Sequence, residues 1–259
     1  MIDITPIPAF DDNYIWLLTR SGYDGCAVVD PGDEDPVIER IRSVGLRLDA
    51  ILITHKHGDH VGGIAGLKAQ WPDALVYGPA NEPVRAIERP LRDGDRVSLQ
   101  GLDIEFAVFD VPGHTEGHIA YYAPGILFCG DTLFAGGCGR VFSGTFEQLS
   151  ASLERLGRLP ADTHVYCAHE YTLANLGFAE WVEPDSEALR ERTRRDQRSR
   201  AADRPTVPST IGDELATNPF MRTDQANVVA AAAEWAGRPL SSRAEVFRAL
   251  RTWKDKDYD

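Results

Sequence analysis

Residues 50–61 read Ala-Ile-Leu-Ile-Thr-His-Lys-His-Gly-Asp-His-Val, and they place three histidines and an aspartate within six positions. The apolar run 50–54 predicts a buried strand, and the segment from Val61 onward predicts a helix. The polar cluster therefore lies on a loop between a strand and a helix. Loops at the carboxyl ends of strands are where α/β folds commonly bind ligands.

Four side chains of this loop can act as metal ligands. Residues two apart in an extended segment project to the same side, so His55 and His57 can converge on one ion. Asp59 and His60 can aim at a second point close by. Without a cation between them, these groups would repel one another or lack hydrogen-bond partners. The loop therefore favours a metal site over a purely structural role.

Three further patches, each after a predicted strand, supply additional ligands. They are Pro112-Gly-His114-Thr-Glu-Gly-His118, Phe128-Cys-Gly-Asp131-Thr and Ala168-His169-Glu-Tyr171. Taken singly, each of these histidines or aspartates would more often be structural. Together with the first loop they form a set of imidazole and carboxylate donors at strand ends. Such donors suit zinc, iron and manganese.

The composition excludes several classes of protein. The chain has 259 residues, is 43% hydrophobic and carries a formal net charge of −13. We expect no nucleic-acid partner, because such binding depends on basic residues that neutralise phosphates. No apolar run reaches the roughly 18 residues of a membrane span, and the first residues lack the features of a signal peptide. A cytoplasmic protein with four free cysteines is expected, and an anionic substrate would need a local basic patch.

The order of predicted elements divides the chain near residue 172. Strands are expected at 14–18, 26–30, 50–54, 74–77, 104–109, 119–122, 126–129 and 163–167, and helices at 34–44, 61–71 and 146–156. This alternation predicts layered sheets flanked by helices over residues 1–172. Strand signals then vanish, and helices are expected at 183–200, 227–236 and 242–253. Residues 173–259 thus form a smaller, all-helical domain.

The first of these later helices is rich in arginine. Its arginines alternate with Glu187, Glu191 and Asp196. That mixture is typical of a solvated face with ion pairs along the helix. The alternative, a basic surface offered to a partner, is less consistent with the interleaved acids.

The metal-ligand motifs resemble a known family. Thr-His-Lys-His-Gly-Asp-His, Gly-His-Thr, Gly-Asp-Thr-Leu-Phe and Ala-His-Glu-Tyr are similar to those of the metallo-β-lactamase superfamily, an αββα sandwich. The resemblance implies that one metal ion is held by His55, His57 and His114, and a second by Asp59, His60 and His169, with Asp131 bridging both. It also implies catalytic roles for Asp59 and Asp131. His118 is expected to be structural or to support a ligand.

Two divalent transition-metal ions are therefore expected, with zinc favoured and iron or manganese as alternatives. Paired ions can share a water and lower its pKa enough to give hydroxide at neutral pH. Two divalent cations, two aspartates and one hydroxide leave about one positive charge. That charge can stabilise the oxyanion formed when hydroxide attacks a carbonyl.

Four other segments narrow the resemblance to the glyoxalase II (hydroxyacylglutathione hydrolase) family. They are Asn218-Pro-Phe-Met-Arg222, Arg251-Thr-Trp-Lys254-Asp, Gly136-Gly-Cys-Gly-Arg140-Val-Phe142-Ser-Gly-Thr and Pro6-Ile-Pro-Ala-Phe-Asp-Asp-Asn-Tyr14. By position, the resemblance implies that Arg140, Tyr171, Arg251 and Lys254 bind a glutathione thioester. Arg251 and Lys254 are three apart on a helix, so both can reach one carboxylate. Alternatively, they only complement the helix dipole.

The chain departs from some family members at two of these positions. Arg140 stands where others have lysine, which changes the hydrogen-bond geometry. Phe142 stands where some have tyrosine, which puts one hydroxyl contact to the substrate in doubt.

The implied reaction is hydrolysis of S-lactoylglutathione to D-lactate and glutathione, in methylglyoxal degradation, by a monomer. Within the same fold, the rivals are a single-iron persulfide dioxygenase and a lactonase. The helical domain and the pair of Arg251 and Lys254 argue against both. A non-catalytic binding module with a relict site is a further alternative. All seven ligand positions are filled, however, and a relict site would not need a complete set of ligands.

Overall fold

The computed structural model describes residues 2–258. The chain divides into two compact units, which we describe separately. Unit 1 runs to Val111 and resumes with Thr115–Gly130, whereas unit 2 contains Pro112–His114 and Asp131 onward. Within residues 2–258, no helix is both long enough and apolar enough to cross a membrane.

The first sheet of unit 1 has the strand order β1-β2-β3-β4-β5-β6. Its strands are Ile2–Ala9 (β1), Asn13–Arg20 (β2), Gly25–Val29 (β3), Arg47–Leu52 (β4), Leu75–Pro79 (β5) and Arg89–Leu91 (β6). Strands β1 to β3 pair antiparallel, and β3 to β6 pair parallel. The carboxyl ends of the parallel strands therefore meet at one edge, and the histidine loop leaves from β4 at that edge.

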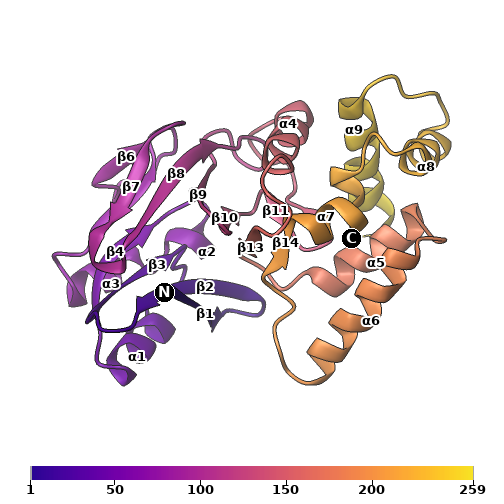
Figure 1. Cartoon of the computed structure of the whole chain (residues 1–259). Helices are drawn as coiled ribbons and strands as arrows, with labels where there is room; N and C mark the ends of the chain where they lie inside the picture. The colour runs from indigo at the N-terminus through magenta and orange to yellow at the C-terminus, as the bar shows by residue number, and fades with distance from the viewer. Residues whose placement is uncertain (1, 259) are drawn as a thin grey trace. The chain divides into compact units, whose positions relative to one another are not determined.

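Helices α1 (Asp35–Ser43) and α3 (Ile64–Gln70) pack on this sheet (Figure 1). Val37 of α1 and Leu67 of α3 are fully buried in the same apolar cluster as Ile51 of β4. A four-residue helix, α2 (Gly58–Val61), precedes α3. The long helix expected at 61–71 is therefore interrupted by two glycines.

The remaining strands of unit 1 form an antiparallel meander. They are β7 (Arg96–Leu99), β8 (Ile104–Asp110), β9 (Ile119–Ala123) and β10 (Ile126–Gly130), with a short 3₁₀ turn η1 (Gln100–Leu102) after β7. The buried Tyr121 hydroxyl of β9 donates to the carbonyl of Ile53 at 2.8 Å. This bond ties the meander to the chain just before the histidine loop.

Unit 2 is mostly helical. Its elements are β11 (Leu133–Phe134), β12 (Gly137–Cys138), α4 (Phe146–Leu156), β13 (His164–Cys167), α5 (Thr172–Val182), α6 (Glu187–Ala201), β14 (Ser209–Thr210), α7 (Ile211–Thr217), η2 (Pro219–Met221), α8 (Ala226–Ala236), α9 (Arg243–Trp253) and a final π-helical turn η3 (Lys254–Tyr258). Helix α4 begins with a capping box between Thr145 and Gln148.

Most expected elements are found within a few residues of their predicted bounds, but β1, β6, β7, α5, α7 and the two-residue strands were missed. Strand β1 contains Pro6 and Pro8, which argue against a strand because proline has no N–H to donate to a sheet hydrogen bond. The strand tolerates them because it pairs with β2 at the edge of the sheet.

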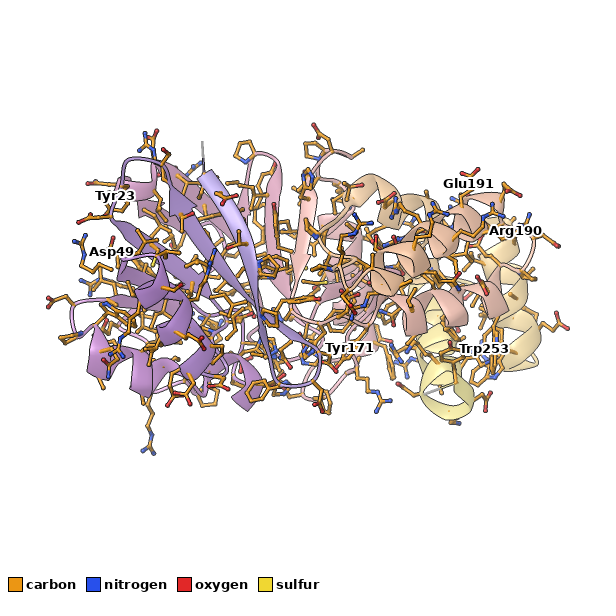
Figure 2. The ribbon with its side chains drawn as sticks, turned by 90° about the horizontal axis from the view of Figure 1, so that it is seen from below. Tyr23, Asp49, Tyr171, Arg190, Glu191 and Trp253 are labelled. Atoms are coloured by element: carbon orange, nitrogen blue, oxygen red, sulfur yellow. The ribbon has the colours of Figure 1, made fainter. Side chains whose placement is uncertain are left out.

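The arginine-rich helix α6 differs partly from its expected solvated face. Arg190 and Glu191 do point outward (Figure 2), and Glu187 pairs with Arg190 at 2.9 Å. In contrast, Arg192 is only 3% exposed and donates to Glu214 of α7 at 2.7 Å. Charge alternation alone cannot distinguish an exposed arginine from one that is buried against a partner from a distant segment.

Candidate metal centre

The histidine loop of unit 1 gathers four candidate ligands after β4. The ring centroid of His55 lies 4.7 Å from that of His57 and 4.0 Å from that of His60. His60 Nε2 lies 3.4 Å from Asp59 Oδ2. His55 and His60 are fully buried. The loop thus brings together the four residues that the sequence singled out.

Asp30, which the sequence analysis did not single out, supports this loop. Its carboxylate accepts hydrogen bonds from the backbone N–H of Thr54 at 2.8 Å and from its hydroxyl at 2.7 Å. His60 Nδ1 lies 3.0 Å from Asp30 Oδ2. A carboxylate behind a histidine fixes the orientation of the ring and leaves the other nitrogen for a metal. Asp30 directly follows β3, so its strand-end position was the signal that could have revealed it.

Asp59 also has a partner that sequence reasoning missed. Asn13 Nδ2 donates to Asp59 Oδ2 at 3.1 Å, and Asn13 is only 7% exposed. This bond restrains a carboxylate whose side chain is 39% exposed. The segment Pro6–Tyr14 had been noted only for its resemblance to a family.

Three candidate ligands meet in unit 2. Asp131 Oδ2 lies 3.4 Å from His114 Nε2, and its other oxygen, Oδ1, lies 3.4 Å from His169 Nε2. All three residues are buried. One carboxylate therefore faces two different imidazoles, one with each oxygen.

The backbone fixes the tautomer of His114. Its Nδ1 lies 2.8 Å from the carbonyl oxygen of Arg140. Because a carbonyl can only accept, Nδ1 carries the proton and Nε2 keeps its lone pair toward Asp131. Gly139 permits this approach, since a Cβ there would lie 2.9 Å from His114 Nδ1 and 2.0 Å from the carbonyl oxygen of Asp131.

The donor separations fit metal coordination. Two ligands bound at about 2.1 Å with tetrahedral angles lie about 3.4 Å apart. The pairs Asp59–His60, Asp131–His114 and Asp131–His169 all have this separation. The imidazole and carboxylate atoms present therefore suit divalent metal ions.

Aromatic side chains surround the histidines of unit 2. Tyr171 stacks on His169 with centroids 4.7 Å apart and planes within 5°, and Phe134 meets both rings edge-on. Phe142 contacts His114 edge-on at 5.2 Å and is 65% exposed. An exposed phenylalanine beside a candidate ligand offers apolar surface for a substrate.

His118 stacks on His55, with centroids 4.6 Å apart and planes within 15°. Its Nδ1 lies 3.0 Å from the carbonyl of Ile119. His118 thus packs against a candidate ligand from within unit 1, consistent with the supporting role expected from the sequence.

The candidate substrate-binding cations lie close together in unit 2. Arg140 Nε lies 3.4 Å from Asp255 Oδ1, and Arg251 Nη2 donates to the same oxygen at 2.8 Å. Lys254 Nζ lies 5.6 Å from the ring centre of Tyr258. Arg140 is exposed, whereas Arg251 and Lys254 are only 1% and 5% exposed. The sequence did not indicate this burial or the shared carboxylate of Asp255.

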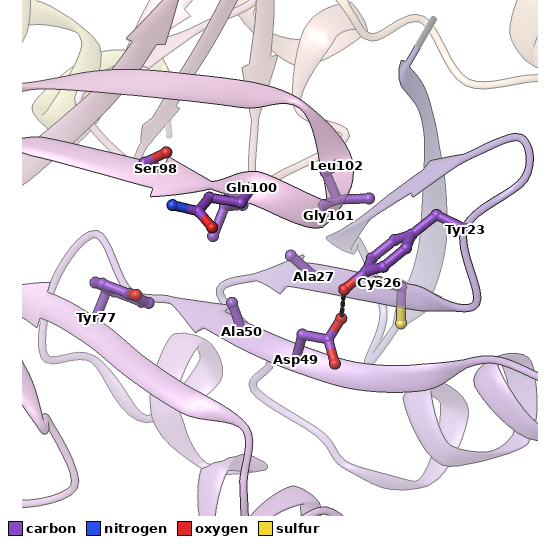
Figure 3. Close-up of a pocket in the computed structure, with 11 residues that line it drawn as sticks. Tyr23, Cys26, Ala27, Asp49, Ala50, Tyr77, Ser98, Gln100, Gly101 and Leu102 are labelled. Atoms are coloured by element: carbon purple, nitrogen blue, oxygen red, sulfur yellow. Dashed lines mark hydrogen bonds between the residues drawn. The ribbon is translucent and has the colours of Figure 1, made fainter.

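A separate cavity of about 250 Å³ lies in unit 1, lined by strands β3 to β5 and by the β7–η1 segment (Figure 3). Tyr23 donates to Asp49 at 2.7 Å at its rim. Its lining residues include no histidine and none of the candidate ligands. The candidate metal ligands of unit 1 therefore lie outside this cavity.

Comparison with known proteins identifies two family models along the chain. Residues 9–169 match the metallo-β-lactamase superfamily, and residues 170–257 match the C-terminal region of hydroxyacylglutathione hydrolase. The expected fold class, an αββα sandwich followed by a helical region, is confirmed.

Individual relatives agree with these matches. A protein from Alkalilimnicola ehrlichii named hydroxyacylglutathione hydrolase is 54% identical over 99% of this chain and 100% of its own length. The structure of ETHE1 from Myxococcus xanthus is similar in fold, with a TM-score of 0.69 at 22% identity over 100% of this chain and 93% of that one. The structure of TTHA1623 in a di-iron-bound form has a TM-score of 0.53 and 33% identity over 64% of this chain and 91% of its own.

With its catalytic and C-terminal segments both matched, this chain belongs to the hydroxyacylglutathione hydrolase family, thiolester hydrolases of the metallo-β-lactamase superfamily.

Proposed function

We propose that the chain hydrolyses the thioester bond of S-(2-hydroxyacyl)glutathione, with S-lactoylglutathione as the substrate and D-lactate and glutathione as products. This reaction serves the degradation of methylglyoxal. The match of residues 170–257 to the hydroxyacylglutathione hydrolase C-terminus favours it over persulfide oxidation or lactone hydrolysis.

The observation that carries the proposal is the position of Asp131 between His114 and His169, with one oxygen 3.4 Å from each Nε2. A carboxylate in this arrangement can contribute one oxygen to each of two ions. The di-iron form of TTHA1623 supports the same expectation of paired metals.

We assign the ligands of two divalent ions accordingly. One ion would be held by His55, His57 and His114, the other by Asp59, His60 and His169, and Asp131 would be a ligand of both. Zinc is the metal we favour, with iron or manganese able to bind the same donors. Metal ions held by these residues would supply an activated water at neutral pH and positive charge that stabilises the oxyanion.

The chain's own residues organise this chemistry. Asn13 restrains the carboxylate of Asp59, and Asp30 orients His60, so the ligands are held in place before substrate binds. Hydrolysis adds water to the carbonyl carbon, breaks the C–S bond and returns a proton to the glutathione sulfur. The apolar surface of Phe142 beside His114 can exclude bulk water from the acyl group.

Arg140, Tyr171, Arg251 and Lys254 hold the glutathione portion in this proposal. The exposed guanidinium of Arg140 is the direct ligand for a carboxylate, because it is the most accessible of the three cations. The local positive charge offsets the acidic balance of the whole chain. We further propose that the enzyme is a cytoplasmic monomer with domains at 1–172 and 173–259. Four free, buried cysteines are consistent with a reducing compartment.

One experiment tests the proposal directly. Portions of the purified protein are reconstituted with zinc and with ferrous iron, the metal content of each is measured, and hydrolysis of S-lactoylglutathione is followed. We expect about two ions per chain and turnover of the thioester. Saturation near one iron, with oxygen consumed on glutathione persulfide and no thioester turnover, would establish the dioxygenase instead. A parallel assay on a lactone tests the other rival.

A further inference from the structure

A short hairpin in unit 2 joins a candidate metal ligand to a candidate substrate ligand. Strands β11 and β12 pair antiparallel, with Phe134 opposite Gly137. We call residues 131–140 the Asp131 hairpin, because Asp131 is its first residue and Arg140 its last. The carbonyl of Arg140 also orients His114. The position of this hairpin therefore affects both parts of the proposed site.

Side chains from four helical segments hold the backbone of this hairpin. Asn175 donates to the carbonyl of Ala135 at 3.1 Å, and Asn218 donates to the carbonyl of Gly137 at 2.8 Å. Arg251 donates to the carbonyl of Cys138 at 3.2 Å, and Glu214 accepts from the N–H of Gly136 at 2.8 Å. All four side chains are at most 3% exposed. Hydrogen bonds so well shielded from water are costly to break.

Glu214 is the centre of this arrangement. Its Oε2 accepts from Gly136 and from Asn218 Nδ2 at 2.9 Å, and its Oε1 accepts from Arg192 Nη2 at 2.7 Å. Glu214 is fully buried. Arg192, in turn, pairs with Asp196. A buried carboxylate with a cationic partner on one side and a backbone amide on the other can hold the two in a fixed relation.

The backbone at Gly136, which donates to Glu214, allows this close contact. Gly136 has φ 72°, which glycine adopts without strain. A Cβ on the neighbouring Gly137 would lie 2.5 Å from Asn175 Cγ. The helical segments therefore approach the hairpin backbone more closely than a side chain would permit.

We propose that Glu214 is a positioning residue that, through the N–H of Gly136, sets the Asp131 hairpin and so the geometry of Asp131 and Arg140. The consequence for activity rests on the proposed function, whereas the anchoring itself does not. The arginine-rich helix α6 then contributes to the site through Arg192, rather than through its exposed face.

The principal test is Glu214→Gln. The amide keeps the size of the side chain but presents an NH₂ to Gly136, Asn218 or Arg192, each of which is already a donor. Amide hydrogen exchange across residues 133–140 should accelerate roughly tenfold to a hundredfold, the range expected for one lost hydrogen bond to a charged group. Exchange is followed by mass spectrometry on the whole, metal-loaded protein.

Asp196→Asn is the matched control. It makes the same substitution in the same buried network, but Asp196 contacts Arg192 and Arg195 rather than the hairpin. It should lower the stability of the protein without selective acceleration of hairpin exchange. If Glu214→Gln accelerates exchange no more than Asp196→Asn, or accelerates it evenly along the chain, Glu214 is only part of the core.

Two further measurements keep the proposal testable. If Glu214→Gln does not fold, Asn175→Ala removes one anchor and leaves the carboxylate network intact, and the same local acceleration is expected. In active protein, Glu214→Gln should raise KM much less in an Arg140→Ala background than in the parent, because both act through Arg140. Fully additive effects on KM would overturn the link. Exchange results stand even if the thioester is not the substrate.

Discussion

Asp30 Oδ2 lies 3.0 Å from His60 Nδ1, and the backbone N–H and the hydroxyl of Thr54 both donate to the same Asp30 carboxylate. The bonds from Thr54 fix the carboxylate, and the carboxylate fixes the ring. The orientation of a ligand proposed for one ion thus depends on a residue that is not itself assigned to either metal.

Asp30→Asn should therefore weaken metal binding without emptying the site. Loss of such a supporting group typically lowers metal affinity roughly tenfold to a hundredfold. Competition with a chromophoric chelator measures the affinity. Asp49→Asn, at the rim of the cavity in Figure 3, makes the same substitution in the same unit. Equal effects of the two variants would remove Asp30 from the role given to it.

Asp131→Asn should be far more damaging. An amide can offer only one oxygen, so it cannot face His114 and His169 equally, and it removes half of the carboxylate charge assigned to the two ions. We expect turnover to fall at least about a hundredfold, with one ion retained on average. Circular dichroism checks that the fold persists. Activity within about threefold of the parent, with both ions bound, would contradict the bridging role.

The three cations proposed to bind substrate, Arg140, Arg251 and Lys254, should respond differently to substitution because they differ in exposure. Arg140 is exposed, so Arg140→Ala should chiefly raise KM for S-lactoylglutathione, by roughly tenfold to a hundredfold for a lost charged contact. Lys254→Ala should act in the same direction. Steady-state kinetics measure KM for both single variants. At raised salt, screening should weaken the affinity of the parent for substrate more than that of the Arg140→Ala/Lys254→Ala double variant. Parental kinetics in both variants would reduce these cations to a structural role.

Arg251→Ala should also cost stability. The side chain is 1% exposed and donates to the carbonyl of Cys138 and to Asp255. Its removal takes a buried donor from the Cys138 carbonyl and one of two cationic partners from Asp255, so we expect a loss of about 1–3 kcal/mol in the free energy of unfolding. Denaturant titration measures this loss. An unchanged midpoint, with KM raised, would show that Arg251 acts only on substrate.

The proximity of His55 to His57 and His60 could be predicted because its signal is local. The spacing of His55 and His57 gives their side chains the same direction on an extended segment, whatever surrounds them. Asp30 and Asn13 carry no such spacing. Each supports a ligand from a segment remote in sequence, and only the folded chain brings the pairs into contact.

The same distinction explains the helical region. Helices α8 and α9 were expected near 227–236 and 242–253, and both are found close to those bounds. The burial of Arg192 and Glu214 could not be predicted from the sequence, since a charged residue on a helix is ordinarily exposed. Their pairing depends on helices α6 and α7 meeting in three dimensions.

The cysteines give a prediction about reactivity. Burial raises the pKa of Cys26 and Cys167 to about 12 and that of Cys138 to about 11. At neutral pH these thiols are therefore protonated, and the thiolate is the reactive form. In native protein we expect negligible modification by a thiol reagent over minutes, and four thiols per chain after denaturation. Rapid modification of one native thiol would mean that its environment opens to solvent.

The first turn of α9 predicts a dependence of stability on pH. Hydrogen bonds from the side chain and backbone of Ser241, with a further contribution from Arg238, lower the pKa of Glu245 to about 2. The carboxylate bonds Ser241 N at 2.7 Å and Ser241 Oγ at 2.6 Å. A lowered folded-state pKa gives stability that is present above the unfolded value, near 4.5, and is lost as pH falls toward 2.

Glu245→Gln should remove this contribution. The melting temperature of the parent should exceed that of the variant between about pH 5 and 7. The gap should narrow progressively below pH 4.5 and close near pH 2, because protonated glutamate and glutamine then have similar hydrogen-bonding capacity. Glu234→Gln, in the neighbouring helix α8, serves as the control substitution. A gap between parent and Glu245→Gln that stays constant from pH 7 to 2 would mean that the charge of Glu245 does not stabilise the start of α9.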